Sequence, residues 1–136
     1  MRAVLDVNVI ISGLLSRGGA PADVLRALDD GAFEAVASPD LLSELARALA
    51  YPKLRRHIQE DGAEAILHWF ATTATVVPDP SQAPPARSTD ADDDYLVVLA
   101  SAHRAVLVSG DNHLLALAPE IPVFAPREFL TWLDAQ

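Results

Sequence analysis

Cysteine is absent from the 136 residues of this chain, which excludes both a disulfide framework and a zinc site with cysteine ligands. The sequence therefore leaves the redox compartment open. Long apolar runs are absent as well, because no stretch approaches the roughly 18 consecutive apolar residues that a membrane span needs. The first apolar run is also too short for a signal peptide. We expect a soluble, cytoplasmic protein without a membrane partner.

Positive charge is scarce in this chain. Its 10 Lys and Arg residues stand against 19 Asp and Glu residues, so the formal net charge is −9 at pH 7. Proteins that bind nucleic acid usually present a basic patch, and the acidity counts against that function unless cations neutralise some of the carboxylates. Carboxylates that are crowded together as ligands need such a counter-ion. The acidity is thus compatible with a metal site.

Short apolar segments alternate with amphipathic ones, and 51% of the residues are hydrophobic. This composition predicts one globular domain that spans residues 1–136. The expected strands are 2–5, 33–37, 75–78, 106–108 and 121–124. The expected helices are 8–15, 21–30, one that begins after Ser38 or Asp40 and ends at Pro52, 54–60, 63–72, 92–104, 112–117 and 127–134. The alternation predicts an α/β fold, with a small parallel β-sheet and helices on both faces.

Two carboxylates directly follow two of the apolar segments. Asp6 comes after the strand 2–5, and Asp111 comes after the segment 105–110. Ligands bind at the carboxyl ends of the strands of an open parallel sheet, so acids from distant parts of the chain can meet there. Together with Glu44 and the acidic run 90–94, they offer enough hard oxygen ligands for Mg²⁺ or Mn²⁺. This pattern predicts the site of a metal-dependent enzyme.

Each of these acids also has a purely structural interpretation. Asp6 and Asp111 precede expected helices, where a carboxylate can cap the first turn. Glu44 borders the apolar face of its helix and needs a partner, which is either a metal ion or Arg47. The acids of the run 90–94 complement the dipole of the helix that follows them. For each acid taken alone, both interpretations stay open.

Helix phase selects one residue within the acidic run. Asp93 stacks over the apolar residues four and seven positions later, so we expect it to be the metal ligand. Asp92 and Asp94 are expected to be more exposed. Asp90 is expected to cap the helix or to support the ligands.

Four motifs, taken in order, resemble the PIN domain over almost the whole chain. They are LDVNVIISGL at 5–14, SELA at 43–46, DADDDY at 90–95 and VSGD at 108–111. Within that family the chain is similar to the short stand-alone toxins of toxin–antitoxin pairs, of the VapC-like type. The resemblance implies a single PIN-like domain with metal-dependent endoribonuclease activity, a cognate antitoxin protein as partner and a homodimer.

The resemblance also implies roles for individual residues. The acids that would hold Mg²⁺ or Mn²⁺ are Asp6, Glu44, Asp93 and Asp111. Asn8 and Ser109 fall where the family has small polar supports, and Asp90 is assigned to the same supporting role. In the expected mechanism, the ions lower the pKa of a bound water and neutralise charge on the scissile phosphate of the RNA.

Basic residues are concentrated in two places. Arg17 lies beside a Gly-Gly loop, and Lys53, Arg55 and Arg56 lie close together, with His57 next to them. We expect Arg17, Lys53, Arg55 and Arg56 to contact the RNA backbone. A solvated helix face explains the second group equally well.

Two other classes of protein fit parts of the pattern. A Mg²⁺-dependent phosphatase or phospho-acceptor domain also has acids at strand ends and would use Asp6 as its nucleophile. That class needs a lysine near the phosphoryl group, whereas the only lysine, Lys53, lies in an expected helix far from any strand end. The other class is a non-catalytic protein interaction module, which would bind no metal ion.

Overall fold

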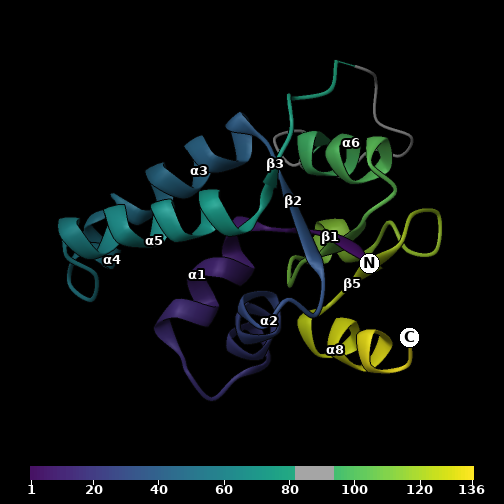
Figure 1. The fold of residues 1–136 in the computed structure, drawn as a ribbon, viewed down its shortest axis with the longest axis horizontal. Coiled ribbons are helices and arrows are strands. Elements are labelled where there is room, and N and C mark those ends of the chain that lie inside the picture. Colours follow the sequence, from purple (N-terminus) through teal and green to yellow (C-terminus); the bar gives the residue numbers. More distant parts are fainter. Residues whose placement is uncertain (82–93) are drawn as a thin grey trace.

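The computed structural model describes residues 1–81 and 94–136 (Figure 1). Its strands are β1 (Arg2–Leu5), β2 (Glu34–Ala37), β3 (Thr75–Val76), β4 (Val106–Val108) and β5 (Val123–Phe124). Its helices are α1 (Val7–Leu15), α2 (Ala20–Asp29), α3 (Pro39–Leu49), α4 (Pro52–Arg55), α5 (Glu60–Thr73), α6 (Asp94–Ala102), α7 (Asn112–Leu115) and α8 (Pro126–Asp134). The order of strands and helices is the predicted one.

The described strands form one parallel sheet in the order β3-β2-β1-β4-β5, which confirms the predicted α/β fold. β1 lies at the centre, and Leu5 at its end is fully buried. In the register of β1 with β4, Leu5 lies opposite Val108. The next residue is Asp6 on β1 and Ser109 on β4. The pairing therefore brings these two polar side chains together at the carboxyl edge of the sheet.

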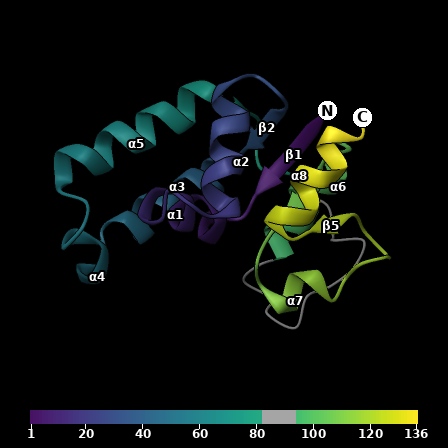
Figure 2. The ribbon, with the colours of Figure 1, turned by 90° about the horizontal axis from the view of Figure 1, so that it is seen from below.

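Helices cover both faces of the sheet. α6 packs against β4, β1 and β2 on one face, whereas α2 packs against α1 and α8 on the other face (Figures 1 and 2). The largest fully buried side chains of the core include Phe70 of α5, Phe129 of α8, Ile10 of α1, Leu45 of α3 and Leu99 of α6. In the described part of the chain, no helix has both the length and the apolar character that crossing a membrane requires.

The segment after α3 differs from the prediction. α3 ends at Leu49, and Pro52 begins the short helix α4 instead of ending the preceding one. Proline is tolerated there because the first turn of a helix needs no N–H donor. Tyr51 before it is extended (φ −61°, ψ 139°), the conformation that a residue before proline prefers. A helix does follow α3, but the predicted bounds 54–60 are wrong, because α4 ends at Arg55 and α5 begins at Glu60.

β3 is also shorter than the predicted strand 75–78. The N–H of Val77 still donates to the carbonyl of Ala37, at 2.8 Å. Pro78 has no N–H with which to continue this pairing, so regular strand structure stops before it.

Candidate active site

Asp6 links the end of β1 to the start of α1. Its backbone N–H donates to the carbonyl of Val108 at 3.0 Å, which extends the pairing of β1 with β4 by one residue. Its Oδ1 accepts a hydrogen bond from the N–H of Asn8 at 3.3 Å and so caps α1. The side chain is buried, with 5% of the residue exposed. Asp6 is therefore a helix cap, and this role occupies one of its two carboxylate oxygens.

Ser109 joins Asp6 to Asp111. Its hydroxyl donates to Oδ2 of Asp6 at 2.7 Å and accepts a hydrogen bond from the N–H of Asp111 at 3.0 Å. Ser109 is completely buried. The hydroxyl therefore holds the carboxylate of β1 and the backbone after β4 in a fixed relation across the edge of the sheet.

Asp111 caps the start of α7 as Asp6 caps the start of α1. Its Oδ1 accepts a hydrogen bond from the N–H of His113 at 2.9 Å. Asp111 and Gly110 line a hollow of about 270 Å³ together with the exposed Asn8 from α1. The structure thus brings together four of the residues that the sequence assigned to the site, namely Asp6, Asn8, Ser109 and Asp111.

The electrostatics of this group favour a bound cation. Burial raises the pKa of the Asp6 carboxyl above its ordinary value of 3.8, the nearby Asp111 charge adds to the rise, and the hydrogen bonds from Ser109 and Asn8 oppose it. Burial and a like charge both disfavour the ionised form of a carboxyl group, whereas a cation beside it favours that form.

Glu44 lies on α3 and is half-buried. Its Oε2 accepts a hydrogen bond from the hydroxyl of Tyr95, the second residue of α6. The sequence offered a metal ion or Arg47 as the partner of Glu44, and the tyrosine was missed. A tyrosine directly after the acidic run was the available signal, but its partner on α3 depends on where the fold places α6 relative to α3.

The acidic run is described only from its last residue onward. Asp90, Asp92 and Asp93 lie outside the described residues, so the assignment of Asp93 as a ligand and of Asp90 as a support stays a prediction. Asp94 begins α6 and is buried, with 9% of the residue exposed. The expectation that Asp94 is more exposed is wrong, because α6 is buried on nearly all sides and its first residue is covered as well.

The donor set fits Mg²⁺ or Mn²⁺. Asp6 and Asp111 provide hard carboxylate oxygens, and Mg²⁺ is commonly held by one or two carboxylates and several waters. Within residues 1–81 and 94–136, no three Asp, Glu or His side chains are placed to hold an ion by themselves. These residues include Glu44, so the structure does not bring Glu44 together with Asp6 and Asp111 as one ligand set, and its role as a ligand stays a prediction.

The structure does not place the predicted RNA contacts next to Asp6. Arg17 is exposed and follows α1 at the end away from Asp6, where its carbonyl accepts a hydrogen bond from Arg26 at 3.2 Å. Lys53, Arg55 and Arg56 lie in or directly after α4, at the end of α3 away from the sheet (Figure 2). Contacts between these four residues and RNA stay a prediction.

Arg55 and Lys53, both on α4, differ in their exposure to solvent. Nη1 of Arg55 is buried and has no hydrogen-bond partner among the described residues, and the side chain lines a hollow with Glu60 and Glu64. Arg55 is thus partly withdrawn from solvent. Lys53 is exposed on α4, so it does not supply the lysine beside Asp6 that a phospho-acceptor domain needs.

At the carboxyl edge of the parallel sheet, the Ser109 hydroxyl links the carboxylate of Asp6 to the backbone N–H of Asp111. The family model of the PIN domain matches residues 2–113. The chain belongs to the PIN domain family. PIN domains are generally nucleases, and PIN nucleases typically use divalent metal ions.

One relative by sequence and one solved structure are similar to nearly the whole chain. An uncharacterized protein of Methanocaldococcus jannaschii is 26% identical over 141 residues, which cover 96% of this chain and 90% of that protein. The crystal structure of PAE2754 from Pyrobaculum aerophilum is similar, with a TM-score of 0.67, 17% identity and coverage of 100% of this chain and 91% of that chain.

Two further solved structures share the fold. One is the crystal structure of VapBC2 from Rickettsia felis bound to a DNA fragment from the VapBC2 promoter. Its TM-score is 0.64 at 13% identity, and the match covers 90% of this chain and 97% of that chain. The other is FitAcB from Neisseria gonorrhoeae, with a TM-score of 0.60, 22% identity and coverage of 92% and 98%.

Proposed function

We propose that this protein is a metal-dependent endoribonuclease that hydrolyses RNA phosphodiester bonds. The observation that carries the proposal is the bridge from Asp6 through Ser109 to Asp111, at the carboxyl edge of the sheet of a PIN domain. A buried carboxyl with a raised pKa beside a second carboxylate favours a bound cation, and oxygen ligands favour Mg²⁺ or Mn²⁺.

The proposed ligands of one or two metal ions are Asp6, Glu44, Asp93 and Asp111. When bound, the metal supplies a water of lowered pKa and neutralises charge on the scissile phosphate. Ser109 holds the carboxylate of Asp6 through its hydrogen bond, so the ligand needs little reorganisation when the ion arrives. Asn8 and Asp90 are proposed as further supports. No side chain acts as a covalent nucleophile.

We further propose that the protein is the toxin of a toxin–antitoxin pair and acts in the cytoplasm as a homodimer. The fold that it shares with VapBC2 and FitAcB supports this proposal. A gene beside its own should then encode a small antitoxin protein. Expression of the chain should arrest growth, and co-expression of that neighbour should relieve the arrest.

The nuclease proposal is tested with purified protein and an end-labelled single-stranded RNA. We expect cleavage with Mg²⁺ or Mn²⁺ and none in EDTA, with recovery when Mn²⁺ is added back, because all proposed ligands are oxygens. Asp6→Asn and Asp111→Asn should fail together, whereas Asp134→Asn, at the exposed end of α8, should cleave normally. Full cleavage in EDTA would contradict the proposal.

A further inference from the structure

A polar hollow lies between α3 and α6, on the side of Glu44. It has a volume of about 430 Å³ and is lined by Asp40, Ser43, Glu44, Arg47 and Tyr95. We call it the α3–α6 hollow. Glu44 belongs both to the proposed metal ligands and to the wall of this hollow. A group that is bound in the hollow would therefore lie beside this one proposed metal ligand.

Tyr95 fixes one wall of the α3–α6 hollow. Its hydroxyl donates to Oε2 of Glu44, so it joins the start of α6 to the middle of α3. Both side chains are half-buried, which limits competition from water for this hydrogen bond. The hydrogen bond limits the rotation of the Glu44 carboxylate, so it holds this proposed ligand in one orientation.

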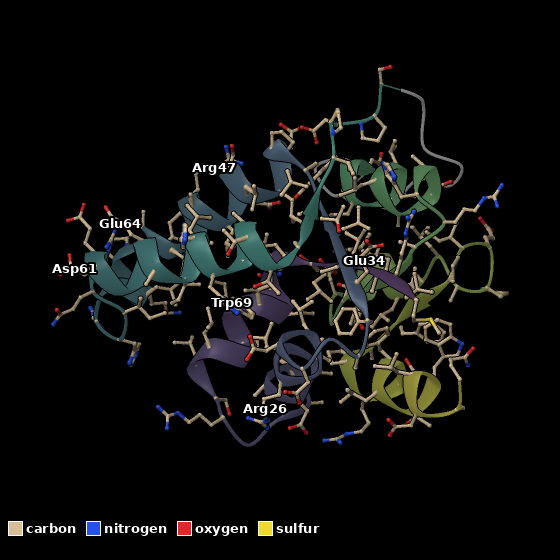
Figure 3. The ribbon with its side chains drawn as sticks, viewed as in Figure 1. Arg26, Glu34, Arg47, Asp61, Glu64 and Trp69 are labelled. Carbon is tan, nitrogen blue, oxygen red and sulfur yellow. The ribbon has the colours of Figure 1, made fainter. Side chains whose placement is uncertain are left out.

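Arg47 supplies the positive charge of the α3–α6 hollow. It follows Glu44 by three residues on α3, so both side chains project from the same face of the helix. Arg47 is exposed and projects into solvent (Figure 3). Within the part of the chain that the structure describes, no hydrogen bond or ion pair engages its guanidinium, whereas Arg2 and Arg26 are paired with Glu34 and Asp23.

The charges in the α3–α6 hollow set a condition on its ligand. Asp40 and Glu44 outnumber the single Arg47 in the lining, so the hollow repels an anion when no cation is bound. A divalent cation on Glu44 reverses this balance. The planar guanidinium of Arg47 then matches a phosphate group, with which arginine forms paired hydrogen bonds.

We propose that the α3–α6 hollow is a phosphate subsite for the substrate strand, in which Arg47 contacts a phosphate and Tyr95 is the positioning residue of Glu44. This inference rests on the proposed nuclease function and names the residues that hold the strand beside the metal. Arg47 acts on the substrate, whereas Tyr95 acts on the metal ligand. The two residues therefore have different experimental signatures.

Arg47 is tested by the binding of a non-cleavable 2′-O-methyl RNA of mixed sequence, followed by fluorescence anisotropy with Mn²⁺ at several salt concentrations. We expect Arg47→Gln to bind about tenfold more weakly and to lower the salt slope by about one. Arg47→Lys keeps the charge and should restore the slope. Arg104→Gln is the matched control, because Arg104 follows α6 at the opposite edge of the sheet. Equal RNA binding by Arg47→Gln and Arg104→Gln would overturn the role of Arg47.

Tyr95 is tested by thermal melts and calorimetry with Mn²⁺ alone. Tyr95→Phe keeps the ring and removes the hydroxyl, so we expect the Mn²⁺ concentration for half-maximal stabilisation to rise by about tenfold or more. The salt slope of RNA binding should not change. Tyr51→Phe is the matched control, because Tyr51 is 65% exposed at the start of α4. The same Mn²⁺ midpoint for both variants would overturn the role of Tyr95.

The two levels of the hypothesis fail separately. If the wild-type protein binds Mn²⁺ and RNA with the expected changes in both variants but cleaves no RNA, the subsite stands and the nuclease proposal fails. If the wild type cleaves RNA and neither variant differs from its control, the nuclease stands and the subsite fails.

Discussion

At the scale of single residues, the site depends on a carboxylate that the fold makes costly to ionise. Asp6 is buried, faces the charge of Asp111 and is held by Ser109. The hydrogen bond from Ser109 compensates for part of this cost without a metal. The same features that would position Asp6 for a cation therefore destabilise the ionised protein when no cation is present.

This cost predicts the pH dependence of stability for Asp6→Asn. The folded-state pKa of Asp6 is raised, so the native state binds more protons than the unfolded state, and stability falls as pH rises from the ordinary value of 3.8 through the raised value. Asparagine is a comparable helix cap and does not ionise. We expect Asp6→Asn to be more stable than wild type at pH 7 in EDTA, by urea unfolding, and to lose this advantage below pH 3.8. A variant that is less stable at both pH values would contradict the burial argument.

The acidic run predicts a second outcome at this scale. Asp93→Asn removes one proposed ligand charge, so we expect RNA cleavage to fall by about 100-fold or more while the chain still folds. Asp92→Asn should cleave almost normally and serves as the control. Asp94→Asn is the informative competitor, because the structure shows that Asp94 is buried. If Asp94→Asn cleaved no RNA while Asp93→Asn remained active, the metal ligand would be Asp94 and our assignment of Asp93 would be wrong.

At the scale of elements, α1 and α2 approach so closely that only glycine fits at position 13. A Cβ added to Gly13 would lie 2.7 Å from Cδ1 of Leu25 and 2.9 Å from the carbonyl oxygen of Pro21. The leucine can shift its side chain, but the backbone of Pro21 cannot move without displacing α2.

Gly13→Ala should therefore destabilise the protein. The steric cost of about 1–3 kcal/mol exceeds the gain in helix propensity of about 1 kcal/mol, so we expect a melting temperature lower by a few degrees. Gly62→Ala is the control on α5, because its Cβ would meet Cγ2 of Ile58 at an ordinary 3.6 Å. That variant should melt at a higher temperature than wild type. A Gly13→Ala protein that is as stable as Gly62→Ala would show that α2 moves aside easily.

At the scale of the whole molecule, the net charge of −9 and the acidic edge of the sheet link cation binding to stability. Any ligand that binds only the folded state raises the melting temperature, in proportion to the logarithm of its concentration above its Kd. We expect millimolar Mn²⁺ to raise the melting temperature of the wild type relative to EDTA. Asp111→Asn, which loses one proposed ligand, should respond less. A melting temperature that is the same with Mn²⁺ and with EDTA would favour the non-catalytic interaction module.

Much of the fold and part of the site could be predicted from the sequence by itself. Hydrophobic periodicity, prolines and capping residues are local signals, and they predicted the alternation of strands and helices that became a parallel sheet. The same signals placed Asp6 and Asp111 directly after strands. The boundary errors at Pro52 and at β3 are also local, since proline begins a helix as readily as it ends one.

Only the tertiary structure decided which of these residues meet. Strand order and register made Asp6 and Ser109 neighbours across 103 positions of the chain. The placement of α6 relative to α3 gave Glu44 its hydrogen bond from Tyr95 across 51 positions. Asp94 is buried because α6 is covered on nearly all sides. A helical wheel of this one segment does not show which of its sides other elements cover. Such contacts depend on the relative placement of whole elements, because packing energy is shared over the core and no local stretch of sequence encodes it.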